Sequence, residues 1–119
     1  MKKTLVLGAS PNPARVSYDA THRLTKAGHE TVLVGIRQGE VAGLPIHTDK
    51  PEVEGVDTLT LYVGPKNQPA WYDYILKTEP KRIIFNPGAE NPELAKMASE
   101  EGIEVDYACT LVLLGTGQY

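Results

Sequence analysis

Short apolar runs alternate with longer amphipathic segments along the whole of this chain. Some runs are apolar at every position, as in Leu5-Val6-Leu7, which is typical of strands covered on both faces of a parallel sheet. The runs predict strands over residues 4–7, 31–34, 58–63, 83–85 and 103–106, with a short edge strand over residues 44–48. Such alternation is the pattern of a parallel sheet with covering helices.

The segments between the strands carry helix signals. Apolar residues recur at helical spacing over residues 15–27, which predicts a helix there. Two prolines, Pro65 and Pro69, bracket the start of a second helix. A third helix begins at Asn91-Pro92, an N-cap residue followed by a proline at the first helical position. After the last strand, residues 111–114 form an apolar tail that we expect to pack against the sheet.

The predicted order of strands and helices is that of one doubly wound α/β domain. A parallel sheet would lie between two layers of helices, as in Rossmann-type domains, and the domain would extend over residues 1–119. A length of 119 residues, with 41% hydrophobic and 23% charged residues, fits a globular domain of ordinary composition. The sequence shows no linker, repeat or low-complexity segment.

Charge and composition argue against several classes of function. The formal net charge of -3 differs from the strong basic excess of a general nucleic-acid binder. No apolar run approaches the roughly 18 residues of a membrane span. The single cysteine, Cys109, excludes an internal disulfide and a cysteine-cluster metal site, and its apolar neighbours indicate a buried, inert thiol. We therefore expect a cytoplasmic protein with no nucleic-acid, membrane or metal partner.

The segment from Gly8 to Arg15 joins the first strand to the first helix and is the main candidate for ligand chemistry. Ligands of open α/β sheets bind beyond the carboxyl ends of the strands, where a helix N-terminus offers free amides to a phosphate. Ser10 can donate a hydroxyl hydrogen bond there, and Arg15 a fork of charged donors. The segment is neither a G-x-G-x-x-G fingerprint nor a P-loop. The alternative is structural: Gly8 would serve packing, and Ser10 or Asn12 would cap the helix.

The end of the second strand bears on the identity of the nucleotide. Enzymes that use NAD place a carboxylate about 20 residues after the glycine loop to hold the ribose hydroxyls. Here residues 34–39, at and after the end of the second strand, contain no carboxylate before Glu40, and Arg37 occupies that neighbourhood. An arginine suits a phosphorylated ribose, as in NADP or in the 3′-phosphate of coenzyme A. The alternative is an arginine that is simply solvated in a loop.

Several motifs in this order, taken together, resemble a known family. They are Gly8-Ala9-Ser10-Pro11-Asn12-Pro13-x-Arg15, Tyr62-Val63-Gly64-Pro65, Phe85-Asn86-Pro87-Gly88-Ala89-Glu90-Asn91 and the segment over residues 106–113. The chain resembles the small stand-alone CoA-binding proteins of bacteria and archaea, whose fold matches the N-terminal domain of the succinyl-CoA synthetase α subunit. The resemblance extends over essentially the whole chain.

The resemblance implies a site for coenzyme A or an acyl-CoA across the strand ends. By this resemblance the phosphate loop consists of Gly8, Ala9, Ser10, Pro11, Asn12 and Pro13, with Arg15 beside it. Arg37 matches the region that meets the phosphorylated ribose, and the other walls match Gly64, Pro65, Asn86, Pro87 and Gly88. The chain departs from the family at the end of the second strand, where Leu33-Val34-Gly35-Ile36 replaces a Pro-Val-Asn-Pro-like sequence.

The sequence carries no clear catalytic arrangement. His22, His29 and His47 are not placed at the carboxyl ends of predicted strands, and no histidine spacing indicates a metal site. We therefore expect non-catalytic binding of coenzyme A or an acyl-CoA. Two alternatives stay open: an NADP-binding oxidoreductase or nucleotide-sensing domain, in which Arg37 would hold the 2′-phosphate, and a protein-interaction scaffold that has lost ligand binding. No feature of the sequence identifies a partner protein.

Overall fold

Seven strands form one sheet in the computed structural model, which describes residues 1–119. Their order across the sheet is β3-β4-β2-β1-β5-β6-β7. All neighbouring strands run parallel except β3, which pairs antiparallel with β4. The strands are β1 (Thr4–Leu7), β2 (Thr31–Val34), β3 (Glu40–Val41), β4 (Leu44–His47), β5 (Thr58–Leu61), β6 (Arg82–Phe85) and β7 (Glu104–Tyr107).

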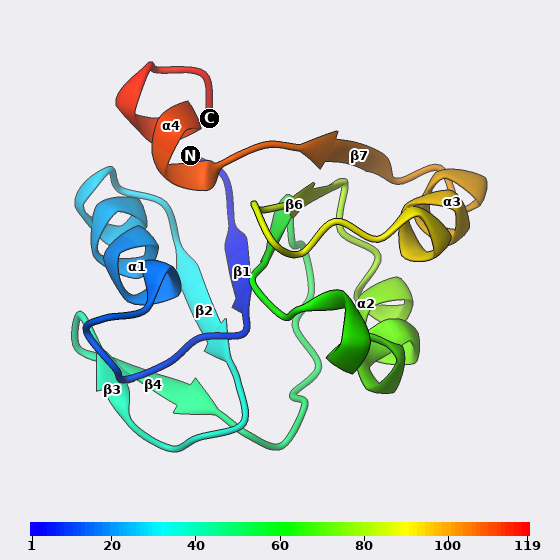
Figure 1. Cartoon of the computed structure of the whole chain (residues 1–119). Helices are drawn as coiled ribbons and strands as arrows, with labels where there is room; N and C mark the ends of the chain where they lie inside the picture. Colours follow the sequence, from blue (N-terminus) through cyan, green and yellow to red (C-terminus); the bar gives the residue numbers. More distant parts are fainter.

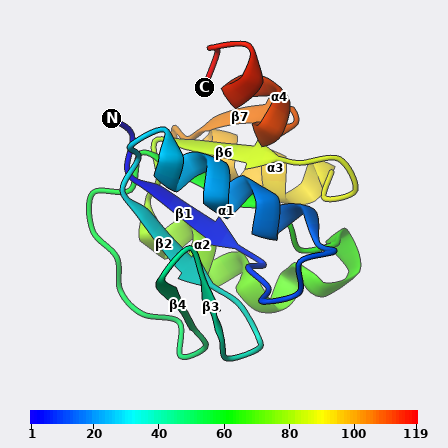
Figure 2. The same cartoon turned by 90° about the vertical axis from the view of Figure 1, so that its left-hand side faces the viewer.

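Helices cover both faces of this sheet, so the predicted doubly wound, three-layer α/β fold is confirmed. Helices α1 and α4 lie on one face, and α2 and α3 lie on the other (Figures 1 and 2). The helices are α1 (Val16–Lys26), α2 (Tyr72–Thr78), α3 (Pro92–Glu100) and α4 (Thr110–Gly115). No helix of the chain has both the length and the apolar character that crossing a bilayer requires.

The central strand β1 separates two apolar clusters. Leu5 and Leu7 point into the cluster beneath α2 and α3, whereas Val6 points into the smaller cluster beneath α1, because successive side chains of a strand alternate between its faces. All three side chains have no exposed surface. A strand buried on both faces explains why the sequence reads as a continuous apolar run.

The chain leaves β1 toward β2 through α1, while β5 pairs with the other side of β1. The connections at the carboxyl ends of β1 and β5 therefore diverge, and open α/β sheets bind their ligands at such a point. The loop from Gly8 to Arg15 leaves β1 at this point. The fold thus places the predicted phosphate loop at the topological switch point.

Three local expectations differ from the structure. The pattern of the sequence does not predict β3, because two residues carry too little pattern to recognise. The helix expected after Pro65 is preceded by two separate turns of 3₁₀-helix, Pro65–Asn67 and Pro69–Trp71, so α2 begins only at Tyr72. The segment over residues 111–114, expected only as an apolar tail, forms most of α4, which packs beside α1.

Candidate functional site

Gly8 lets the chain turn sharply at the end of β1. Its φ is +97°, and a Cβ atom there would lie 3.1 Å from backbone atoms of Tyr62 and Val63 on the neighbouring strand connection. The amides of Gly8 and Ala9 both donate to the Val34 carbonyl, at 2.9 and 3.0 Å. Gly8 therefore serves the close packing of two strand connections, as the structural interpretation of this loop predicts. The start of the loop is attached to β2 by the two hydrogen bonds to Val34.

Local hydrogen bonds hold the rest of this loop in shape. The Ser10 Oγ accepts from the Asn12 amide at 3.1 Å, and the Asn12 Oδ1 accepts from the Ala14 amide at 3.0 Å. The Asn12 carbonyl accepts from the Arg15 amide at 3.0 Å. Neither Ser10 nor Asn12 caps α1, because the N-cap residue is Arg15 and no side chain caps it. Both residues instead stabilise the turn that leads into the helix.

The uncapped start of α1 leaves backbone donors available. The amides of Val16 and Ser17 donate no hydrogen bond within the chain, and neither does the amide of Ser10. The first amides of a helix lack intrahelical partners, and they carry the positive end of the helix dipole. A phosphate oxygen is a suitable acceptor for such a group of donors.

A hollow of about 260 Å³ lies at this point, lined by Ser10, Pro11, Asn12, Arg15 and Arg37. Both arginines are exposed, and no carboxylate lines the hollow. The four ion pairs of the chain involve other residues. Neither guanidinium group has an acidic partner, and Arg15 directly precedes the free amides of Val16 and Ser17 in the chain. The volume is slightly below the ~300–1,000 Å³ typical of ligand sites, so it suits part of a nucleotide.

Two glycines bring Arg37 to this hollow. A Cβ atom at Gly35 would lie only 2.4 Å from the Ala9 carbonyl oxygen, and one at Gly39 would lie 2.7 Å from the Pro11 Cβ. The turn that carries Arg37 is therefore held against the loop from Gly8 to Arg15 at both of its ends. Neither glycine is among the site residues predicted from the sequence, although their symmetric spacing about Arg37 is a recognisable signal.

The other predicted site residues do not line the hollow. Gly8, Ala9 and Pro13 belong to the same loop, whereas Gly64 and Pro65 follow β5, and Asn86, Pro87 and Gly88 follow β6. Because β5 and β6 are parallel to β1, their connections lie along the same edge of the sheet. A role of these residues in binding stays a prediction.

The Asn86 side chain forms hydrogen bonds that connect the elements at this edge of the sheet. Its amide nitrogen donates to the Thr60 Oγ1 at 2.7 Å and to the Leu61 carbonyl at 3.0 Å. Its Oδ1 accepts from the Thr110 amide at 2.9 Å. Asn86 thus joins β5 and β6 to the start of α4, and each polar atom of its side chain has a partner within the chain.

Gln68 orders the two connections that follow β5 and β6. Its side chain has no exposed surface, and its Nε2 donates to the Val63 and Ala89 carbonyls at 2.8 and 2.7 Å. Its Oε1 accepts from the Asn91 Nδ2 at 2.8 Å. No sequence signal indicates this role, because a glutamine between two prolines has the pattern of an exposed turn.

The titratable groups outside the hollow offer no catalytic pair beside it. His22 is exposed on α1, and His29 lies before β2. His47 ends β4, so it does lie at the carboxyl edge, contrary to expectation, but it does not line the hollow. Cys109 is half-buried rather than buried, at the N-cap of α4. Burial raises the pKa of Tyr62 to about 12, so its phenol stays protonated at neutral pH.

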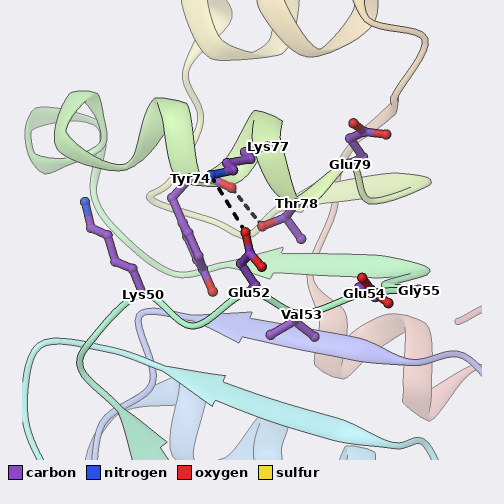
Figure 3. Close-up of a pocket in the computed structure, with 9 residues that line it drawn as sticks. All are labelled: Lys50, Glu52, Val53, Glu54, Gly55, Tyr74, Lys77, Thr78 and Glu79. Carbon is purple, nitrogen blue, oxygen red and sulfur yellow. Dashed lines mark hydrogen bonds and ion pairs between the residues drawn. The ribbon is translucent and has the colours of Figure 1, made fainter.

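A second hollow, of about 450 Å³, lies between α2 and the segment over residues 50–55 (Figure 3). The Lys77 ammonium faces the Glu52 carboxylate at 3.8 Å, and the Tyr74 hydroxyl donates to the Pro51 carbonyl at 2.7 Å. Lys50 donates to a backbone carbonyl of the turn before α2. These paired groups fasten the segment to α2, and the mixture of charges favours no one class of ligand.

A family model and several solved structures match this chain. Residues 2–115 match the model of the family described as "CoA binding domain". A crystal structure of an uncharacterized protein superimposes with a TM-score of 0.98 at 53% identity, covering 100% of this chain and 98% of that one. A hypothetical protein from Pyrococcus horikoshii OT3 gives a TM-score of 0.82 at 25% identity, covering 93% and 80%.

A protein from Thermus thermophilus shares the fold, with a TM-score of 0.84 at 23% identity, covering 99% of this chain and 91% of that one. No curated protein matches the chain with significant similarity. The family match includes the loop from Gly8 to Arg15, the turn that carries Arg37 and the connections after β5 and β6. This chain therefore belongs to the CoA-binding domain family.

Proposed function

We propose that this protein binds coenzyme A or an acyl-CoA, without catalysing a reaction on it, and that the phosphates lie at the start of α1. One observation carries the proposal: Arg15 and Arg37 share a hollow with no carboxylate, beside the free amides of Val16 and Ser17. The amides and the Ser10 hydroxyl would hold the pyrophosphate. Arg15 would add charge-assisted hydrogen bonds, which are about twice as strong as neutral ones.

The order of the strands predicts how the ligand lies along the carboxyl ends of the strands. In nucleotide-binding α/β domains the ribose lies over the end of β2, where a basic residue meets a ribose phosphate. Arg37 follows β2 in this chain and would bind the 3′-phosphate of coenzyme A. The pantetheine arm would then run in the opposite direction, over Gly64-Pro65 and the backbone of Asn86-Pro87-Gly88, toward the start of α4.

Titration calorimetry with coenzyme A, dephospho-CoA and NADP tests this proposal. We expect the unsubstituted protein to bind coenzyme A most tightly, because dephospho-CoA lacks the phosphate assigned to Arg37. The variant Arg37→Ala should bind coenzyme A about tenfold more weakly, the loss of one charge-assisted contact, and should bind dephospho-CoA as before. The variant Arg23→Ala is the matched control, because Arg23 is an exposed arginine in the last turn of α1, away from the hollow.

The outcome also decides between the alternatives. An NADP-binding domain is the second candidate, because Arg37 fits a 2′-phosphate as well as a 3′-phosphate. Tight binding of NADP with no binding of coenzyme A would support that candidate and contradict our proposal. Failure of all three ligands to bind would favour the interaction scaffold.

A further inference from the structure

Gln68 is a fully buried polar residue within an otherwise exposed turn, since its neighbours Asn67 and Pro69 are both exposed. Burying an amide costs free energy unless its hydrogen-bonding atoms find partners. Here both hydrogens of Nε2 are used, on the carbonyls of Val63 and Ala89, and Oε1 accepts from a third side chain. One nitrogen atom therefore fixes the connection after β5 to the connection after β6.

The direction of these two carbonyls determines where the next two amides point. In a planar trans peptide group the N–H points opposite to the C=O, and the chain has no cis peptide bond. Because the Val63 and Ala89 carbonyls point toward Gln68, the amides of Gly64 and Glu90 point away from it. Neither amide donates a hydrogen bond within the chain. Gln68 thus holds two free backbone donors in a fixed direction, one on each connection.

The surroundings of these two donors favour an uncharged acceptor. Gly64 is partly exposed and Glu90 is exposed, so both residues lie at the surface. The Glu90 carboxylate accepts from the Gly88 amide at 2.8 Å, and its negative charge would repel a phosphate at this point. The pantetheine arm of coenzyme A instead carries two uncharged amide groups, whose carbonyl oxygens are acceptors. The donors therefore match the arm of the ligand and not its phosphates.

We propose that Gln68 is a positioning residue, which directs the amides of Gly64 and Glu90 toward the carbonyl oxygens of the pantetheine arm. This inference rests on the proposed function, since it uses the same bound coenzyme A. Gln68 itself touches no part of the ligand, because its side chain is buried and all of its polar atoms have partners within the chain. Its effect on affinity passes through the backbone of the two connections.

Calorimetry with two ligands tests this role: coenzyme A, and 3′-phosphoadenosine 5′-diphosphate, which is the same nucleotide without the arm. Gln68→Met keeps an unbranched side chain but lacks both donors. Its affinity for coenzyme A should fall about five- to tenfold, the scale of one hydrogen bond, whereas its affinity for the shorter nucleotide should stay within about twofold. Tyr72→Phe is the matched control and should bind both ligands as before, because the Tyr72 hydroxyl accepts from Asn91 of the same cluster but is bonded to neither carbonyl.

A second readout uses the unsubstituted protein and decides the matter alone if Gln68→Met does not fold. In NMR spectra, coenzyme A should slow the exchange of the Gly64 and Glu90 amide protons with solvent, whereas the shorter nucleotide should not. Equal affinity changes for both ligands in Gln68→Met, no change for either, or unslowed exchange of these amides in a saturated complex would overturn the inference. If the unsubstituted protein does not bind coenzyme A, the proposed function itself is wrong.

Discussion

Replacing Gly35 by alanine should damage both the stability of this protein and its ligand site. The new Cβ atom would lie 2.4 Å from the Ala9 carbonyl oxygen, whereas an ordinary contact is 3.4 Å or more, so the two segments must separate by about 1 Å. The obstacle is a backbone atom, which cannot move aside as the end of a flexible side chain can. The Ala9 amide is also fixed to the Val34 carbonyl, which leaves the loop little freedom to yield.

The magnitude follows from the cost of overpacking. Forcing extra atoms into a well-packed site destabilises a protein by about 1–3 kcal/mol, so urea denaturation of Gly35→Ala should show a loss of that size. The shift also moves Ser10 and Pro11 relative to Arg37 across the hollow. Since a charged hydrogen bond weakens steeply with distance and angle, we expect affinity for coenzyme A to fall about tenfold or more.

A matched substitution separates this effect from the general effect of replacing a glycine. Gly115 lies in α4 without a positive φ, and a Cβ atom added there would meet no other atom within 4 Å. Gly115→Ala should therefore be neutral or stabilising by about 0.5–1 kcal/mol, as is usual in a helix. Equal stability and equal affinity in Gly35→Ala and in the unsubstituted protein would refute the idea that a close approach fixes the loop.

Other contacts lead to three more predictions. Asn91→Ala should lower the free energy of unfolding by about 1–3 kcal/mol in urea, because Asn91 caps α3 and donates to Gln68 and Tyr72. Burial and neighbouring positive charge lower the pKa of His29 below 6.5 in the folded protein. The imidazole of the unfolded chain therefore binds a proton more readily than that of the folded protein. Stability should therefore decrease as pH falls below about 6.5, and His29→Gln should reduce that slope in urea denaturation at a series of pH values. Raising ionic strength should weaken binding of coenzyme A in calorimetry, because both arginines of the hollow are exposed.

The fold could be predicted from the sequence because apolar patterning is a local signal. The run Leu5-Val6-Leu7 identifies a strand without knowledge of its neighbours, and Asn91-Pro92 marks a helix start by its chemistry alone. The boundary of α2 was less accessible, since two prolines fit either an α-helix or the 3₁₀ turns that the structure contains. The two-residue strand β3 depends on pairing with β4 rather than on any pattern of its own.

The site was predictable only where its residues are consecutive. Ser10, Asn12 and Arg15 could be grouped because they belong to one loop, whereas the approach of Arg37 to that loop depends on the tight packing at Gly35 and Gly39. A glycine is the only signal in the sequence of such a close backbone contact between distant segments, and it does not identify the segment that is contacted. The roles of buried polar groups such as Gln68 depend on three-dimensional partners and were not accessible.

The most direct test of the account is the location of the diphosphate in a crystal of the protein grown with coenzyme A. We expect its oxygens within hydrogen-bond distance of the amides of Val16 and Ser17, about 2.7–3.2 Å, and the ribose phosphate beside Arg37. Density for the bound diphosphate at any other edge of the sheet, with the start of α1 left to solvent, would contradict the central claim.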